Sequence, residues 1–403
     1  MEGAILQIIY IILIAGALGI FAWYISKDAK KYLGGENSLS KVHNTIIYSL
    51  AYINENMLDN GRFVYIRNLK NKYSTDKTAY NTTNHARMLY SLALCERELN
   101  ITEFADRRRT SARYFVERYV KPIGYGRYAA ISDPQEENLK CEKAKLSSTA
   151  MALVAFSDLR GEGHIADEIF EGMGQFLLFM QMKTGQFYNY YDIENDGVGD
   201  ENTNRNFTGD APLGLLYLYQ FNPKKKWLDG AKKGLLYLAN KRKDRKEVQF
   251  DYNAMLATEK LFKTPDNGLS DDERVLLKYH LIKMVEQFIP KQIVNKDDQY
   301  YGALIDDLKP MNIACIIEGL IASYNCIDDE ILKMRIMKSI DTGVKFLRLS
   351  QIQKGPLKGG FPNSADWREL GVPKNASVVR MDTVQHALAA CAKFQSMFIE
   401  KDD

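Results

Sequence analysis

NGRFVY, from Asn60 to Tyr65, is the first of six aromatic turns that recur along this 403-residue chain. Most of them contain glycine, and an apolar stretch follows each one. The others are GYGRYA at 124–129, TGQFYNYY at 184–191, VQFDY at 248–252, DDQYYG at 297–302 and KGGFPN at 358–363. Their anchoring aromatics are Phe63, Tyr125, Phe187, Phe250, Tyr301 and Phe361, separated by 62, 62, 63, 51 and 60 residues. This period indicates a repeated unit whose neighbours bury one another's apolar faces.

Sixty residues accommodate two helices and their connections. One set of segments is amphipathic, which is typical of helices with one dry face. These lie at roughly 40–55, 102–120, 165–183, 225–242, 270–289 and 329–352. The other set is apolar on nearly every side, as buried helices are, at 88–95, 148–156, 211–219, 254–262, 313–324 and 384–394. The alternation predicts an all-α fold, an (α/α)6 toroid in which an outer ring of helices surrounds an inner ring.

Charge and cysteine content narrow the function classes. The 54 basic and 51 acidic residues nearly balance, so no electrostatic field for nucleic acid is indicated. Short basic runs such as 107–109 and 224–226 are interpreted as solvated helix faces. The five cysteines show no CxxC or Cys/His metal spacing. We therefore expect no disulfide framework, no metal site and no cofactor.

The N-terminal region predicts a membrane anchor. Residues 4–25 form an uncharged apolar run of 22 residues, about 33 Å long as a helix, which is enough to cross a bilayer core. The expected organisation is therefore an anchor and juxtamembrane segment at 1–33, a linker at 34–39 and the toroid at 40–403. Lysines at 27, 30 and 31 follow the span, which favours a cytoplasmic toroid by the positive-inside rule. A folded domain can override so weak a signal, so an extracytoplasmic toroid stays open.

In such a toroid the inner helices all begin at one rim, so the residues at their starts are candidates for a binding site. This set is rich in polar side chains: His85, Arg87, Ser147, Ser148, Asp210, Asp251, Asn253, Asn312, Arg380, Asp382, Gln385 and His386. Ser147, Asp210, Asp251 and Asn312 also fit as helix caps or first-turn residues. Both interpretations stay open at this stage.

Three aspartates in that set suggest glycosidic bond cleavage. One carboxyl group would protonate the leaving oxygen while a second activates water or attacks. We predict Asp251 and Asp382 as this pair, with Asp210 in support. Glu318, inside an apolar run, is either a deep acid or a satisfied core carboxylate.

The remaining candidates would hold the sugar. His85, Arg87, Arg380, His386, Gln385 and Asn312 would orient it, and Tyr190, Tyr252 and Trp367 would stack on it. A His/Arg pair with tyrosines also suits a uronate lyase or epimerase. The acidic loop 191–204 has part of the spacing of a calcium loop but lacks its terminal bidentate glutamate, so we interpret it as an acidic rim.

Three stretches carry a resemblance to a known group: YNTTNHARMLYSLA at 80–93, FTGDAPLGLLYLYQF at 207–221 with WLDGAKKGLLYL at 227–238, and GGFPNSADWRELGVPKNASVVRMDTVQHALAA at 359–390. With them the chain, over nearly all of 40–400, resembles the six-hairpin glycosidase-like (α/α)6 toroids, mostly uncharacterised bacterial and archaeal proteins. The resemblance implies a role in carbohydrate metabolism. The chain has Asn84-His85 where the pattern has Arg-His, and Gly209-Asp210 where it has Gly-Glu. The inner-ring histidines of N-acylglucosamine epimerases are matched only in part, by His85 and His386.

These observations favour a membrane-anchored carbohydrate-active enzyme that acts on a poly- or oligosaccharide, most readily by hydrolysis. Its partners would be a glycan and, through residues 4–25, a lipid bilayer. The alternatives are a non-catalytic glycan-binding or assembly protein of an envelope polysaccharide system, and a uronate lyase or epimerase.

Overall fold

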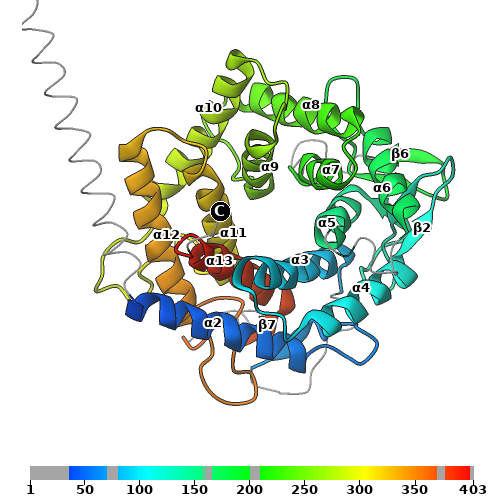
Figure 1. Cartoon of the computed structure of the whole chain (residues 1–403). Helices are drawn as coiled ribbons and strands as arrows, with labels where there is room; N and C mark the ends of the chain where they lie inside the picture. The colour runs from blue at the N-terminus through cyan, green and yellow to red at the C-terminus, as the bar shows by residue number, and fades with distance from the viewer. Residues whose placement is uncertain are drawn as a thin grey trace, which may run out of the picture.

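The computed structural model describes residues 36–69, 80–157, 159, 166–199, 209–369 and 377–399. They form two concentric rings of helices (Figure 1). The inner ring consists of α3 (Thr82–Leu99), α5 (Leu146–Phe156), α7 (Asp210–Phe221), α9 (Tyr252–Lys263), α11 (Pro310–Tyr324) and α13 (Met381–Ser396). The outer ring consists of α2 (Glu36–Glu55), α4 (Ala105–Tyr119), α6 (Asp167–Phe179), α8 (Lys225–Arg242), α10 (Asp271–Phe288) and α12 (Glu330–Ser350). The predicted (α/α)6 toroid is therefore confirmed.

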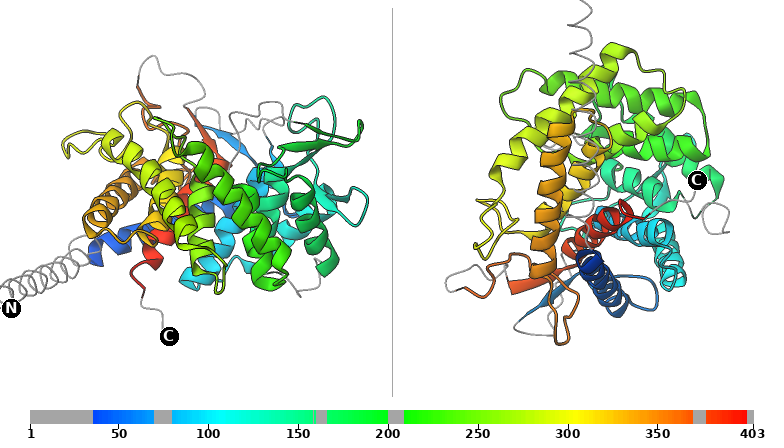
Figure 2. Two further views of the ribbon diagram at one scale, coloured as in Figure 1. Left: turned by 90° about the horizontal axis from the view of Figure 1, so that it is seen from above. Right: turned by 60° about the vertical axis from the view of Figure 1, so that its left-hand side comes forward.

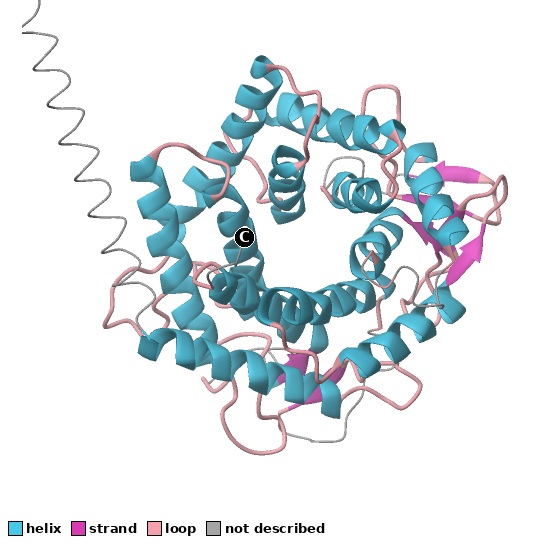
Figure 3. Ribbon diagram, in the orientation of Figure 1, coloured by secondary structure: helices cyan, strands magenta, loops and turns pink. Residues whose placement is uncertain are grey.

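The inner ring is closed. Each inner helix packs against the next one along the chain, and α13 packs against α3 to complete the circle. Figure 3 shows the same closure, with the short strands confined to the periphery. The outer ring closes through α12 and α2. The first and last repeats therefore bury each other's apolar faces and need no separate caps.

Helix composition explains the layering. The inner helices α5, α7 and α11 are buried along almost their whole length, as expected of helices that are apolar on every side. The outer helix α12 buries one face only. Its start is fixed by Asp329, which accepts a hydrogen bond from the amide of Leu332, and Ser270 forms a capping box at α10.

The repeated turns join neighbouring outer helices through glycine. Gly302 follows α10 with a φ of +97°, and a Cβ atom there would lie 2.1 Å from the carbonyl oxygen of Thr342 on α12. Gly359 follows α12 with a φ of +89°, and its Cβ would lie 1.9 Å from the oxygen of Tyr48 on α2. Only glycine satisfies both the positive φ and the close approach. Gly61 and Gly185 approach α4 and α8 in the same way.

The predicted anchoring aromatics differ in their burial. Phe63, Phe187 and Phe361 are fully buried, as expected for anchors. Tyr125 is 96% exposed, so its assignment as an anchor is wrong. In that turn the chain forms a projecting hairpin, and the buried positions are Ala129 and Ala130.

Short strands lie where turns lead into inner helices. β1 (Ile66–Asn68) pairs antiparallel with β7 (Val378–Arg380), with Ile66 opposite Arg380. β2 (Val120–Pro122) pairs with β3 (Tyr128–Ala130). β4 (Lys143–Lys145), β5 (Tyr190–Asp192) and β6 (Gly197–Gly199) form a three-stranded antiparallel sheet. Figure 2 shows these strands grouped toward one end of the toroid.

The predicted anchor, residues 4–25, lies outside the described residues. The predicted linker at 34–39 is already helical from Glu36. Of the helices that the structure describes, none combines the length and the apolarity that a membrane crossing requires.

Candidate functional site

Five side chains, one from each of five inner helices, meet inside the ring; they are called the interior cluster: Arg87, Asp210, Tyr252, Glu318 and His386. Arg87 Nη2 donates to Asp210 Oδ1 at 2.9 Å, and the guanidinium lies 5.3 Å from the centre of the Tyr252 ring. On its other side, Tyr252 is edge-on to the His386 imidazole, with 5.6 Å between ring centres. His386 Nδ1 is 3.3 Å from Glu318 Oε1. These five side chains, which come from distant parts of the chain, thus form one connected polar group.

Burial is greatest at Glu318. Its side chain is 2% exposed, against 12% for Arg87 and 10% for His386. The second carboxylate oxygen of Glu318 lies 3.4 Å from Lys393 Nζ. Lys393 follows His386 on α13 by about two helical turns. Glu318 therefore sits between two cations, and it is the most deeply placed charge of the site.

Burial and these neighbours shift the pKa values of the His–Glu pair. Burial lowers the pKa of His386, but the neighbouring Cys315 and the Glu318 carboxylate outweigh it and raise the pKa to about 10. Burial raises the pKa of Glu318, but Lys393 and His386 outweigh it and hold the pKa below its ordinary value. At neutral pH the pair is therefore an imidazolium beside a carboxylate. His386 therefore carries its proton at neutral pH.

A second ion pair lies at the rim, where β7 leads into α13. Arg380 donates from Nη2 to Asp382 Oδ2 at 2.8 Å and from Nε to Oδ1 at 3.1 Å. The guanidinium also lies 5.6 Å from the centre of the Tyr65 ring. The Arg380 side chain is 31% exposed and that of Asp382 is 7% exposed. Both residues were predicted for the mouth, and the structure pairs them with each other at the start of α13.

Asp251 stabilises the ends of helices. Its Oδ1 accepts hydrogen bonds from the amides of Ala254 and Gly209, both at 3.1 Å, and its Oδ2 accepts from Arg242 Nη2 at 3.0 Å. The cap interpretation is therefore confirmed for Asp251, which begins α9 and fixes the residue before Asp210. Both carboxylate oxygens are engaged in holding helix ends, so the structure does not present Asp251 as a free acid or base.

His85 points away from the cluster. It is 1% exposed and is enclosed by aromatic rings, including Tyr114, stacked at 5.8 Å, and Phe115, edge-on at 5.2 Å. Its Nε2 is 2.9 Å from Ser111 Oγ on α4, and its Nδ1 contacts the Tyr80 hydroxyl. Burial lowers its pKa to about 3. The side chain lies between α3 and α4, a position that does not favour the predicted role of His85 in orienting a sugar.

Two other predicted residues are bonded locally or buried. Asn312, in the first turn of α11, donates to the carboxylate of Asp307 in the preceding loop. Gln385 is fully buried, and neither polar atom of its side chain has a hydrogen-bond partner among the described residues. The backbone carbonyl oxygen of Gln385 accepts a hydrogen bond from Ser91 Oγ of α3 at 3.0 Å. This bond links α13 to α3 where the ring closes.

The predicted stacking aromatics are spread out. Tyr252 belongs to the interior cluster. Tyr190 lies on β5 with Lys143 Nζ 4.0 Å from its ring centre. Trp367 lies in the loop before β7, stacked by Arg368 at 4.4 Å. Tyr252 lies beside two of the other candidate residues, Arg87 and His386.

Lys393 and Glu137 were not predicted. Lys393 lies seven residues after His386 on the same helix, a spacing that puts both on one face. Glu137 accepts from the amide and hydroxyl of Thr82, at 3.2 and 2.8 Å, and pairs with Lys145. It supplies a negative charge to the start of α3 from a distant loop. No local sequence pattern signals that contact.

Within the described residues, no group of His, Cys, Asp and Glu side chains could hold a metal ion. In the acidic loop, Asp192 accepts hydrogen bonds from the amides of Glu194 and Asn195, both at 3.1 Å. This carboxylate therefore shapes the turn between β5 and β6. Positions 200–204 of the loop lie outside the described residues.

No protein-family model matches the chain. No curated protein matches it either. The fold, by contrast, has clear counterparts among solved structures. A sugar epimerase from a ruminal bacterium aligns at a TM-score of 0.65 and 15% identity, over 90% of this chain and 100% of its own. The cellobiose 2-epimerase of Bacillus thermoamylovorans aligns at 0.62 and 13%, over 89% and 99%.

Glycoside hydrolases share the fold as well. The GH76A α-1,6-mannanase of Salegentibacter aligns at a TM-score of 0.57 and 10% identity, over 90% of this chain and 100% of its own. These identities establish architecture and not chemistry. This chain has the six-hairpin glycosidase-like (α/α)6-toroid fold over its described residues.

Proposed function

We propose that this protein is a carbohydrate-active enzyme that binds a neutral sugar at the mouth end of the toroid and acts on it by acid–base catalysis. The observation that carries the proposal is the interior cluster, in which Arg87, Asp210, Tyr252, Glu318 and His386 converge from five helices. Convergent polar groups with a strongly shifted pKa are what acid–base sites require.

Proton transfer at a sugar carbon, as in an epimerase or isomerase, fits this cluster best. A base removes the proton beside the carbonyl group of the open-chain sugar, and an acid returns a proton to the resulting enolate. His386, protonated at neutral pH, is the proposed acid. Asp210 is the proposed base, and Arg87 would stabilise the charge that develops on the sugar oxygen. Epimerases among the structural counterparts make this reaction class reasonable for the fold.

Glycoside hydrolysis is the second candidate, and the α-mannanases with this fold favour it. Asp210 and Asp382 would be its carboxylates, each at the start of an inner helix. Hydrolysis needs one carboxyl group that donates a proton, whereas both of these are ion-paired with arginine. His386 would then have to act as the acid. Asp251 drops out of the proposed pair because its oxygens hold helix ends, as described above.

Two further alternatives keep a place. A uronate substrate is less favoured in the mouth, because its carboxylate would have to displace Asp210 from Arg87. A non-catalytic glycan-binding protein needs the same aromatic and polar groups but no turnover.

We also propose that residues 4–25 anchor the chain in a membrane. Alkaline extraction of membranes that contain the full chain would test this: an anchored chain stays with the membrane pellet, and release into the supernatant would contradict the proposal.

The test is incubation of the full chain with mannose, glucose, cellobiose and α-1,6-mannotriose. Chromatography separates isomers from shortened products, and deuterium uptake from D2O reports proton exchange at the sugar carbon. We expect isomerised product with deuterium, and a loss of about a hundredfold or more in His386→Asn and Asp210→Asn, typical of a removed acid or base. His43→Asn, at an exposed histidine of α2, is the matched control.

Each other result has a defined meaning. Shortened products without deuterium uptake would support hydrolysis and overturn the proton-transfer assignment. Sugar binding without turnover in every preparation would support the binding-protein alternative. Absence of both binding and turnover would remove the carbohydrate proposal.

A further inference from the structure

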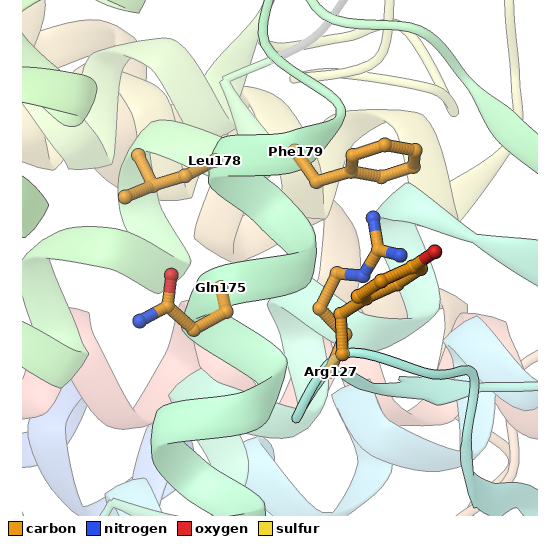
Figure 4. A pocket seen from close by; sticks show the side chains of 5 residues that line it. Arg127, Gln175, Leu178 and Phe179 are labelled. Atoms are coloured by element: carbon orange, nitrogen blue, oxygen red, sulfur yellow. The ribbon is translucent and has the colours of Figure 1, made fainter.

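A second candidate binding site lies on the outer wall, away from the interior cluster. It is called the aromatic groove and is lined by Tyr125, Arg127, Gln175, Leu178 and Phe179. The groove lies between the tip of the β2–β3 hairpin and the last turn of α6, and its volume is about 490 Å³. The groove is shallow and largely open to solvent. Figure 4 shows the Arg127 side chain extending toward the ring of Phe179.

Tyr125 is held outward by an unusual backbone. Its φ is +53°, and it lies between Gly124 at +87° and Gly126 at +70°. A bulky residue in the left-handed region is uncommon and strained. The ring is 96% exposed, so burial of apolar surface does not compensate for this strain in the free protein. Strained residues of this kind concentrate at ligand-binding positions.

Arg127 gives the groove a charge. Its guanidinium lies 4.0 Å from the centre of the Phe179 ring and 5.0 Å from that of Tyr125. Its one hydrogen bond to a described residue runs from Nε to the Gly124 oxygen, at 3.2 Å, and it forms no ion pair with the described residues. Two acidic residues near the groove have other partners: Glu171 of α6 pairs with Lys224, and Asp196 accepts a hydrogen bond from the hydroxyl of Tyr191, which packs edge-on against Phe179. The rings of Tyr125 and Phe179 thus hold the Arg127 guanidinium in place. Its Nη1 and Nη2 groups donate no hydrogen bond to the described residues.

We propose that the aromatic groove binds an acidic glycan, a polysaccharide segment that contains uronic acid residues. The open face of Tyr125 would stack on a pyranose ring, and Arg127 would bind the uronate carboxylate in the bidentate geometry that guanidinium favours. The Gln175 side chain, on the wall of the groove, would supply an amide for sugar hydroxyl groups. The choice of a glycan rests on the proposed function, whereas the choice of an acidic one rests on Arg127.

The groove is connected to the mouth end through the β4–β5–β6 sheet. Phe179 lies edge-on to Tyr191 of β5, with 5.8 Å between ring centres. Tyr191 pairs with Ala144 of β4, and β4 leads directly into the inner helix α5. The β4–β5–β6 sheet therefore links the groove to the start of the inner helix α5. An acidic peptide or a second copy of the chain has no comparable support, and both are outcomes of the test.

The test is affinity electrophoresis of the full chain in native gels that contain polygalacturonate, neutral dextran or polyglutamate. The variants are Tyr125→Asn and Arg127→Gln. Asparagine tolerates the left-handed backbone, and both side chains lie at the surface, so folding is preserved. Tyr279→Ala is the matched control, since this tyrosine is 48% exposed on α10 with Lys283 5.9 Å from its ring. His386→Asn reports on the interior cluster.

We expect polygalacturonate to retard the protein more than dextran or polyglutamate does. The apparent affinity should fall about tenfold or more in both groove variants, as for a residue at the centre of a binding site. It should be unchanged in Tyr279→Ala and in His386→Asn. The gel measures binding in the groove, and the sugar assay measures turnover at the interior cluster. A failure of the groove proposal can therefore be distinguished from a failure of the proposed catalytic function.

Several results would overturn the proposal. Equal retardation by polyglutamate would indicate charge attraction or a peptide site, and retardation by dextran alone would exclude the acidic glycan. A loss confined to His386→Asn would place glycan binding at the mouth. Retardation that depends on protein concentration and not on the polysaccharide would indicate a contact between copies of the chain.

Discussion

Replacement of Glu318 by glutamine should destabilise the protein and change how its stability depends on pH. The carboxylate lies between His386 and Lys393, 3.3 and 3.4 Å away, and its side chain is 2% exposed. The substitution keeps the shape but removes the charge, so two cations would remain without their partner inside the ring. Breaking a buried ion pair in this way costs roughly 3–5 kcal/mol.

The pH dependence follows from His386. Its pKa rises from 6.5 in the unfolded chain to about 10 in the folded protein, so the folded state binds the proton more tightly. The resulting stabilisation is fully present below pH 6.5 and is lost as the pH rises to about 10. Lys260 acts in the opposite direction, because burial lowers its pKa from 10.5 to about 8. The comparison of wild type with variant cancels the Lys260 contribution.

Urea unfolding of both proteins, from below pH 6.5 to about pH 10, measures the effect. We expect Glu318→Gln to be less stable by roughly 3–5 kcal/mol near neutral pH, and the difference should shrink toward pH 10. Glu259→Gln is the control. It removes another inner-helix glutamate paired with a lysine, at 2.7 Å, but the lysine is 65% exposed, so the loss should be below about 1 kcal/mol. A difference that stays constant across the range would refute the assignment of the imidazolium–carboxylate pair.

Three further predictions concern residues that shape the ring. Asp251→Ala should lower the free energy of unfolding by about 2–4 kcal/mol, because it removes an N-cap and a buried ion pair; thermal denaturation measures this, and an unchanged melting temperature with lost activity would instead support a catalytic role. Gly302→Ala should unfold at markedly lower temperature, since its Cβ would lie 2.1 Å from the Thr342 oxygen; a wild-type melting curve would contradict the turn geometry. His85→Phe should cost about 1–3 kcal/mol by leaving Ser111 and Tyr80 without their partner, yet spare activity in the sugar assay; a large loss of activity in a folded variant would show that His85 serves the site.

The fold was predictable because it depends on periodicity. Twelve helical segments were identified from alternating amphipathic and apolar stretches, and their structural counterparts lie at similar positions. The turns were predicted from aromatic residues, but the structure shows that glycines such as Gly359 fix the contact between outer helices. Tyr125 was misjudged for this reason. An aromatic residue next to glycine signals a turn and does not say whether the ring points inward.

The candidate site was predictable only in part, because helix starts were identified without the direction of each side chain. His85 and Arg87 are two residues apart on α3, and such positions face different sides of a helix. Arg87 therefore enters the interior cluster while His85 packs against α4. Asp382 and His386 are four residues apart and share a face of α13. The helical period at the starts of the inner helices therefore distinguishes side chains that face the interior from those that face the outer ring.

The pairing of charges suggests what each site can accept. In the interior cluster Arg87 already has a carboxylate partner, Asp210, at 2.9 Å. A neutral sugar can add its hydroxyl groups to that pair, whereas an acidic sugar must compete with Asp210 in a region of low dielectric constant. On the outer wall the guanidinium of Arg127 has no ion-pair partner among the described residues, so a uronate carboxylate binds there without displacing another. The two arginines thus predict opposite preferences, a neutral sugar in the mouth and an acidic glycan in the aromatic groove. Comparison of methyl galacturonate with galacturonate at each site would separate them, since esterification should weaken binding in the groove and favour binding in the mouth.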